Sequence, residues 1–330
     1  MSSLRGKIHF GESKTGFGLR KNWKGEKTME LFLMQLFNGI SVSSILLLAA
    51  LGLAITFGLM GVINMAHGEF IMIGAYTAYV VQNFFKKYLP ASVFDSYCIV
   101  AILLSFLVAG FCGLILEKLI IRKLYGRAAD SLLVTWGISL ILQQGARSIF
   151  GSPNVGVEAP SFLENSLKIS GMLALPYKRL FILLIAVICL LGVYALMFKT
   201  RQGRNIRAVM QNRNMAASLG VNTSRVDAST FAIGSGLAGL AGCALTWIGA
   251  IGPTLGTNYI VDTFMTVVVG GAGSIIGSVF GAGFIGVGET AFEFMTTASM
   301  GKVLIFVCVI ILLQFRPKGI FAVHTRSLED

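Results

Sequence analysis

Charged residues are scarce in this chain of 330 residues: Asp, Glu, Lys and Arg make up only 13% of it. Soluble domains carry about 25% charged residues, and 55% hydrophobic residues with a mean hydropathy of +0.77 also exclude a water-soluble fold. In lipid every backbone polar group needs a partner inside the protein, which leaves helices or closed β-barrels. The apolar runs are long and do not alternate with polar residues as barrel strands do. We therefore expect an all-α, polytopic membrane protein.

Residues that carry chemistry are also few. The three histidines stand far apart at positions 9, 67 and 324, and the five cysteines form no C-x-x-C pair, so neither a metal site nor a disulfide framework is expected. No phosphate-binding G-x-x-x-x-G-K-[ST] motif is present, because Gly301-Lys302 is followed by Val303. No pair of carboxylates forms a catalytic constellation. These absences argue against an enzyme and against a cofactor bound by this chain.

What the chain does contain is a series of long apolar runs. A membrane-spanning helix needs about 20 residues, and two of the runs are too long for one span. Glycines and polar residues interrupt them at Gly58–Gly61, Asn64–Glu69 and Gly270–Gly273. We expect eight to ten transmembrane helices, some of them short or broken. The runs are Leu31–Phe85, Tyr97–Ile121, Ser131–Phe150, Leu180–Phe198, Val226–Ile251, Tyr259–Phe294 and Val303–Phe315.

The net charge of +12 comes from Lys and Arg residues between the apolar runs and at both ends. This is the pattern of cytoplasmic loops rather than of a nucleic-acid surface. Segment 199–225 is strongly basic, and we expect it and two tails, 1–30 and 316–330, to be cytoplasmic, with a transmembrane domain over 31–315. If residue 86 faces outward, the first run crosses the membrane an odd number of times, and three short crossings are favoured.

Polar groups inside apolar runs are candidates for function. Asn64, His67 and Glu69 interrupt the first run, where such groups are costly and mark a cavity, a pathway or a break between half-helices. A solvated cytoplasmic turn is the alternative. Asp262 begins another apolar run and either caps a helix or faces a pathway. Glu289, with Glu293 four residues later, is expected to be solvated at the membrane interface.

Two further patterns concern packing and partners. Gly273, Gly277 and Gly281 recur every four residues and make a smooth helix face for close approach, within the chain or at a subunit interface. Arg204–Gly220 is a basic amphipathic segment that either lies on lipid headgroups or inserts into a cytoplasmic partner, and Gly220 suits a helix end. The expected apolar face of this segment consists of Ile206, Val209, Met210 and Leu219.

Four segments carry a resemblance to a known family. They are Gly61–Tyr76 (GVINMAHGEFIMIGAY), Arg207–Val221 (RAVMQNRNMAASLGV), Gly270–Gly281 and Arg316–Phe321 (RPKGIF). Together they resemble the permease subunits of ABC importers for branched-chain amino acids and urea, which have a type II-like fold. Residues 75–82 and 252–262 look most like the permease of the urea transporters.

The resemblance implies an inner-membrane complex. This chain would pair with a second homologous permease, two ATPases that bind ATP and Mg²⁺, and a periplasmic solute-binding protein that delivers urea. The coupling segment would contact the ATPases through Arg204, Arg207, Gln211, Asn212, Arg213 and Gly220. Importers generally show E-A-A-x-x-x-G there, but Met215–Gly220 reads MAASLG and lacks the Glu. The polar groups suited to a urea pathway are Asn64, His67, Glu69, Thr135, Asn258, Asp262 and Thr263.

Other functions stay open at this point. A branched-chain amino acid permease needs partners for an ammonium and a carboxylate, which Asp262, Glu69 or Arg147 would supply. A stand-alone channel or secondary carrier would transport solute without other subunits. A membrane enzyme would need clustered histidines or carboxylates, which the chain lacks.

Overall fold

The computed structural model describes residues 16–61, 63–125, 127–168 and 174–321. Long helices dominate this part of the chain, and two short helices, α6 (Arg201–Gln211) and α7 (Arg213–Ser218), follow the fifth of them. The long helices are α1 (Gly16–Met60), α2 (His67–Tyr88), α3 (Tyr97–Leu119), α4 (Ala128–Phe150), α5 (Tyr177–Lys199), α8 (Thr223–Leu245), α9 (Leu255–Gly270), α10 (Ile275–Met295) and α11 (Ala298–Phe315).

Short elements complete the described chain. The 3₁₀ turns are η1 (Ala91–Ser96), η2 (Ile121–Leu124) and η3 (Ser161–Leu163). Strands β1 (Ser166–Lys168) and β2 (Ala174–Pro176) pair antiparallel in the loop before α5, a hairpin that the prolines of this loop did not reveal. Six helices within the described residues are long and apolar enough to cross a membrane: α1, α3, α5, α8, α10 and α11.

The long helices confirm an all-α membrane fold with broken spans, but three crossings in Leu31–Phe85 is wrong. This run holds two helices, because α1 continues without interruption to Met60. Gly52 and Gly58 do not break it. A Cβ on Gly52 would meet the backbone of Gly234 in α8, and one on Gly58 would meet Gly273. Both glycines therefore serve close helix packing, and the chain turns only after Gly61, whose φ is +60°.

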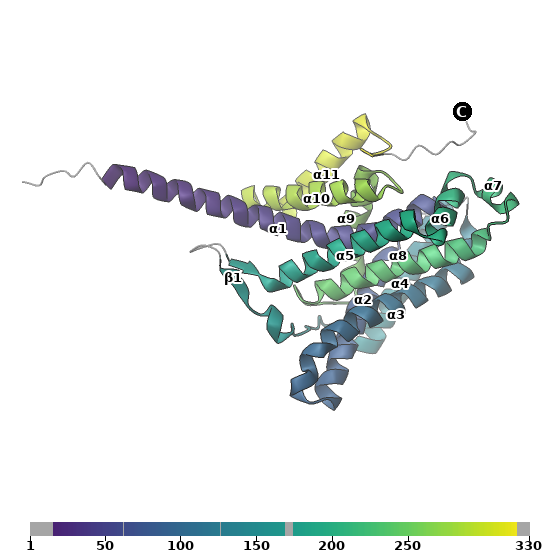
Figure 1. Cartoon of the computed structure of the whole chain (residues 1–330), viewed down its shortest axis with the longest axis horizontal. Coiled ribbons are helices and arrows are strands. Elements are labelled where there is room, and N and C mark those ends of the chain that lie inside the picture. Colours follow the sequence, from purple (N-terminus) through teal and green to yellow (C-terminus); the bar gives the residue numbers. More distant parts are fainter. Residues whose placement is uncertain (1–15, 62, 126, 169–173, 322–330) are drawn as a thin grey trace, which may run out of the picture.

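The arrangement of the helices follows from α1 and α8 (Figure 1). α8 packs against α1, α2 and α3, while α9 and α10 pack against the opposite side of α1 and α11 packs against α10. The hairpin β1–β2 lies at one end of the bundle, and α6 and α7 lie at the other. The N-terminal part of α1 projects at the β1 end. The predicted tails are only partly described, because residues 1–15 and 322–330 lie outside the described residues.

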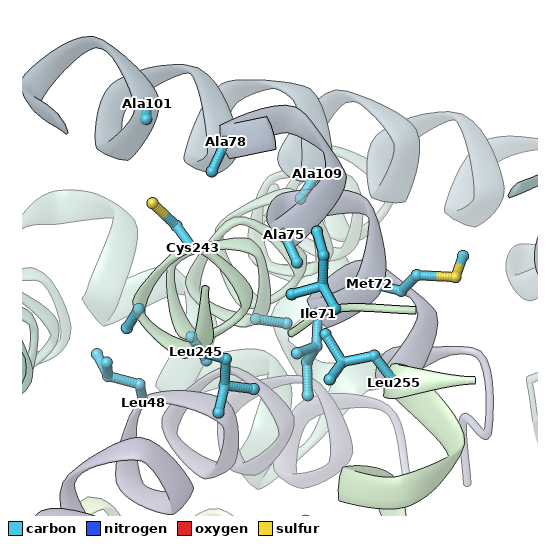
Figure 2. Close-up of a cluster of buried hydrophobic side chains, with 14 of the residues drawn as sticks. Leu48, Ile71, Met72, Ala75, Ala78, Ala101, Ala109, Cys243, Leu245 and Leu255 are labelled. Carbon is cyan, nitrogen blue, oxygen red and sulfur yellow. The ribbon is translucent and has the colours of Figure 1, made fainter. Parts of the chain in front are cut away.

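Small side chains allow α2, α3 and α8 to approach closely. Figure 2 shows Ala75 and Ala78 of α2, Ala101 of α3 and Cys243 of α8 in one buried cluster, and all four are at most 1% exposed. Lipid chains are as apolar as leucine, so helices in a membrane are held mainly by van der Waals packing and hydrogen bonds. The stability of the interface between α2, α3 and α8 therefore depends on how closely their small side chains fit together.

We expect Gly242→Ala to lower the melting temperature of the purified protein by several degrees. A Cβ on Gly242 of α8 would clash with the carbonyl oxygen of Ile71 in α2, and overpacking of this kind costs about 1–3 kcal/mol. Gly249→Ala is the matched control, because a Cβ there meets nothing within 4 Å. Equal melting curves for the two variants in detergent would contradict close packing at Gly242.

Candidate functional site

The break between α1 and α2 is held by polar contacts inside the protein. The Met65 amide donates to Thr135 Oγ1 of α4 at 3.1 Å, and the Ala66 amide donates to Asn64 Oδ1 at 3.1 Å. His67 Nε2 lies 3.2 Å from the carbonyl oxygen of Ala49 in α1. Unpaired backbone groups are costly in lipid, so Asn64 and Thr135 make this non-helical segment tolerable, while His67 fastens the start of α2 to α1.

Glu69 sits in a buried network that joins three helices. Its Oε1 accepts hydrogen bonds from Ser139 Oγ at 2.7 Å and from Gln143 Nε2 at 2.9 Å, both in α4. Gln143 Nε2 also lies 2.8 Å from Thr257 Oγ1 in α9. Glu69 is 1% exposed, so the solvated-turn alternative is wrong. Glu69 Oε2 has no hydrogen-bond partner among the described residues.

A second polar site is a cavity of about 420 Å³ between α1, α9, α10 and α11, here called the α9–α11 pocket. One wall is apolar and comes from α1. The other walls carry amide, phenol, hydroxyl and charged groups. The residues that line it are Val42, Leu46, Asn258, Tyr259, Asp262, Glu289, Thr290, Glu293 and Lys302.

Opposite charges meet in the α9–α11 pocket. Lys302 Nζ lies 3.0 Å from Asp262 Oδ2 and 3.7 Å from Glu289 Oε1. The Asp262 side chain is 6% exposed, while that of Lys302 is 46% exposed. One ammonium thus faces two carboxylates, and Glu293 adds a third acid to the lining. The pocket offers partners for a positive group, a negative group and an aliphatic group.

The predicted pathway residues fall at different places. Asn258 and Asp262 line the α9–α11 pocket, whereas Thr263 donates to the carbonyl oxygen of Tyr259 in its own helix. Asp262 is no helix cap, because α9 begins at Leu255. Lys302 was missed as a site residue. The available signal was a lone lysine directly before the last apolar run, Val303–Phe315.

The basic segment folds as two helices, α6 and α7, separated at Asn212. Asn212 caps α7, because its side chain accepts from the Met215 amide. Ile206 and Val209 are buried, as expected for an apolar face, but Leu219 is 78% exposed, so its assignment to that face is wrong. The reason is the break at Asn212, which ends the periodicity of a single helix. Gly220 follows α7 with a φ of +85°.

Arg213 does not lie on a free polar face. It forms a bidentate ion pair with Asp227 of α8, whose side chain is fully buried, and its guanidinium lies 4.7 Å from the ring centroid of Tyr125. The Tyr125 hydroxyl donates to Glu117 of α3 at 3.2 Å, and Arg122 pairs with the same carboxylate at 3.1 Å. Burial and the carboxylates of Asp227 and Glu117 raise the pKa of Tyr125. We call these five residues the Asp227 cluster.

The glycine series packs within the chain. A Cβ on Gly277 of α10 would meet the backbone of Gly270, and one on Gly281 would meet Thr266 in α9. Gly273 approaches Gly58 and has a φ of +79°. Among the described residues no three His, Cys, Asp or Glu side chains are arranged to hold a metal ion.

A bundle of apolar helices with a charged pocket between them and a basic helix pair at one end defines a membrane transport subunit. The chain matches the family described as "Branched-chain amino acid transport system / permease component" over residues 35–313, and it belongs to this family. No solved structure matches the chain.

Named relatives agree with the family. The branched-chain amino acid permease proteins LivH of Salmonella typhimurium and BraD of Pseudomonas aeruginosa are each 30% identical to this chain, and each alignment covers 88% of this chain and 95% of the relative. The probable LivH of Methanocaldococcus jannaschii is 29% identical over 90% of this chain and 94% of its own length.

The chain is therefore a multi-pass permease subunit of an ABC transporter, and ATP is hydrolysed by partner subunits. Family membership implies ATPase and solute-binding-protein partners. The prediction of urea as the solute finds no support in these comparisons. The relatives are named for branched-chain amino acids, which agrees with the alternative solute.

Proposed function

We propose that this chain, with a second homologous permease, forms the path of an importer for branched-chain amino acids. A binding protein delivers the solute from outside, and two ATPases dock on segment 199–225. The observation that carries the choice of solute is the α9–α11 pocket, which places Lys302 beside Asp262 and Glu289.

The pocket matches the three parts of an aliphatic amino acid. The ammonium of Lys302 suits the solute carboxylate, and the carboxylates of Asp262 and Glu289 suit the solute ammonium. The apolar wall of Val42 and Leu46 suits a branched side chain. Urea is neutral and needs hydrogen-bonding groups rather than paired charges, and it has no use for an apolar wall.

The break before α2 has a different role in this proposal. Asn64 and Thr135 accept from backbone amides of the break, His67 ties α2 to α1, and Glu69 ties α2 to α4 and α9. Because α9 also carries Asn258 and Asp262, the Glu69 network fixes the pocket in place. We assign Asn258 and Asp262 to solute contact. We assign Asn64, His67, Glu69 and Thr135 to holding α2 and α9 in position.

Uptake of labelled leucine and labelled urea by cells separates the two solutes. We expect deletion of this subunit to abolish leucine uptake by the importer and leave urea uptake unchanged. The deletion strain complemented with the intact chain is the control. Loss of urea uptake alone would reject the amino acid assignment. Leucine transport by vesicles that contain this chain alone would instead favour a stand-alone carrier.

We also propose that the N-terminal end of α1 lies outside, contrary to the cytoplasmic location expected from its charge. Asn38, in the first half of the span Leu31–Gly58, bonds to Arg179 at the start of α5, whereas Gly58 meets Gly273 and Met210 at the end that carries α6. A membrane-impermeant maleimide should therefore label Phe32→Cys in intact spheroplasts, and Ser218→Cys only after lysis. The unsubstituted chain is the blank, and the reverse labelling pattern would reject this topology.

A further inference from the structure

A cavity of about 380 Å³ lies where α5 ends, beside α6 and the start of α10. We call it the α5–α6 cavity. Its wall is mostly apolar and includes Met197, Phe198, Met210 and Ile275, and Tyr194 and Ile276 also line it. It is separate from the α9–α11 pocket and shares no residue with it.

One cationic group stands in this apolar surrounding. The guanidinium of Arg207 lies 5.1 Å from the ring centroid of Phe198, and its Nη1 is buried without a hydrogen-bond partner among the described residues. A charged donor removed from water is costly unless it is paired. Arg213 forms an ion pair with Asp227, whereas the buried Nη1 of Arg207 has no such partner among the described residues. An anion bound in the cavity would supply one.

The surroundings indicate which anion. Exposed apolar side chains follow α5 at helical spacing down to the cavity: Leu184, Ile188, Leu191, Tyr194 and Phe198. The rest of the chain buries little of α5, so this chain leaves the stripe open to lipid. α10 begins at the cavity, and the positive end of a helix favours negative charge. A free anion would meet the guanidinium but would leave the apolar wall uncovered.

We propose that the α5–α6 cavity binds one anionic phospholipid from the adjoining leaflet. The lipid phosphate pairs with Arg207 near the start of α10, and an acyl chain runs along Tyr194 and the exposed stripe of α5. Because α6 belongs to the basic segment, the lipid would join α5, α6 and α10 where this segment meets the membrane. Arg207 then contacts lipid, whereas the exposed Arg204 on the same helix stays free for a protein partner.

The test uses the delipidated transporter complex, titrated with phosphatidylglycerol or phosphatidylcholine and followed by native mass spectrometry. We expect the intact chain to bind one phosphatidylglycerol per copy with at least about tenfold preference over phosphatidylcholine. Arg207→Gln should remove this preference. Arg204→Gln is the matched control. It removes the same charge from an exposed residue of α6 and should keep the preference for phosphatidylglycerol.

Three outcomes would overturn the proposal. They are equal binding of the two lipids by the intact chain, an unchanged preference in Arg207→Gln, and full competition by inorganic phosphate at the concentration of the lipid. The first and third use only the intact chain, so they decide the matter even if Arg207→Gln fails to fold.

Discussion

Asp227→Asn is expected to abolish most of the ATP hydrolysis that solute and binding protein stimulate, while basal hydrolysis remains. Asp227 is the buried partner of Arg213, which connects α7 to α8. α8 in turn packs against α1, α2 and α3. If the ATPases move segment 199–225, the Arg213–Asp227 pair is a direct link through which the motion of α7 reaches α8. Without the carboxylate, α7 can shift without α8.

The energy of a buried ion pair is large enough for Asp227→Asn to have a large effect on stimulated ATP hydrolysis. Removing one member of a buried ion pair costs about 3–5 kcal/mol, because the other charge is left unpaired. Arg213 is 38% exposed, so we expect the lower end of this range. The loss falls at the junction of α7 with α8 rather than throughout the fold, because Tyr125 and Arg122 still bind Glu117.

Matched variants distinguish the loss of the Arg213–Asp227 pair from the mere loss of a charge. Arg213→Gln should reproduce the loss, and Asp227→Asn with Arg213→Gln should be no worse than either single change, since both break one interaction. Lys118→Gln removes one positive charge from an exposed position on α3, outside segment 199–225, and should leave stimulation intact. Full stimulation in Asp227→Asn, measured with purified complex in nanodiscs, would remove the pair from the coupling path.

Run length and composition were sufficient to predict the membrane fold. The lipid requirement for internal hydrogen bonds leaves helices, and the breaks at Gly61–Ala66 and after Gly270 were visible as glycine and polar residues. The continuity of α1 was not visible. A glycine in a sequence marks either a break in a helix or a close contact with a neighbouring segment. Gly52 and Gly58 make close contacts, because the structure places Gly234 opposite Gly52 and Gly273 opposite Gly58.

The sites were predictable only in part for a similar reason. Asn64, Glu69 and Asp262 stand out as polar residues in apolar runs, so single positions suffice to flag them. Their partners do not stand out. Lys302 is 40 residues from Asp262, and Arg213 looks like one more arginine of a basic segment until Asp227 is placed beside it. Pairing between distant segments depends on helix packing, which periodicity does not encode.

Lys302→Gln is expected to reduce leucine transport by at least about 30-fold, which corresponds to about 2 kcal/mol. Truncating one partner of a buried charge pair costs about 2–5 kcal/mol, and we take the lower end because Lys302 is half exposed. In the proposed site, the lost group is the partner of the solute carboxylate. The change also leaves Asp262 and Glu289 without a cation. Lys302→Arg keeps the charge and should retain part of the transport, and Lys318→Gln at an exposed position should retain all of it.

A double variant distinguishes solute binding from a purely structural ion pair. Lys302→Gln with Asp262→Asn removes the nearer of the two carboxylates that lose their cation, and it should restore most of the melting temperature that Lys302→Gln alone lowers. Transport should stay low, because the solute carboxylate still has no cation in the α9–α11 pocket. Recovery of leucine transport together with stability would mean that Lys302 only neutralises Asp262, and the solute site would then have to lie elsewhere. Low transport in a stable double variant would mean that the charged pair Lys302–Asp262 acts on the solute and does not only stabilise the fold.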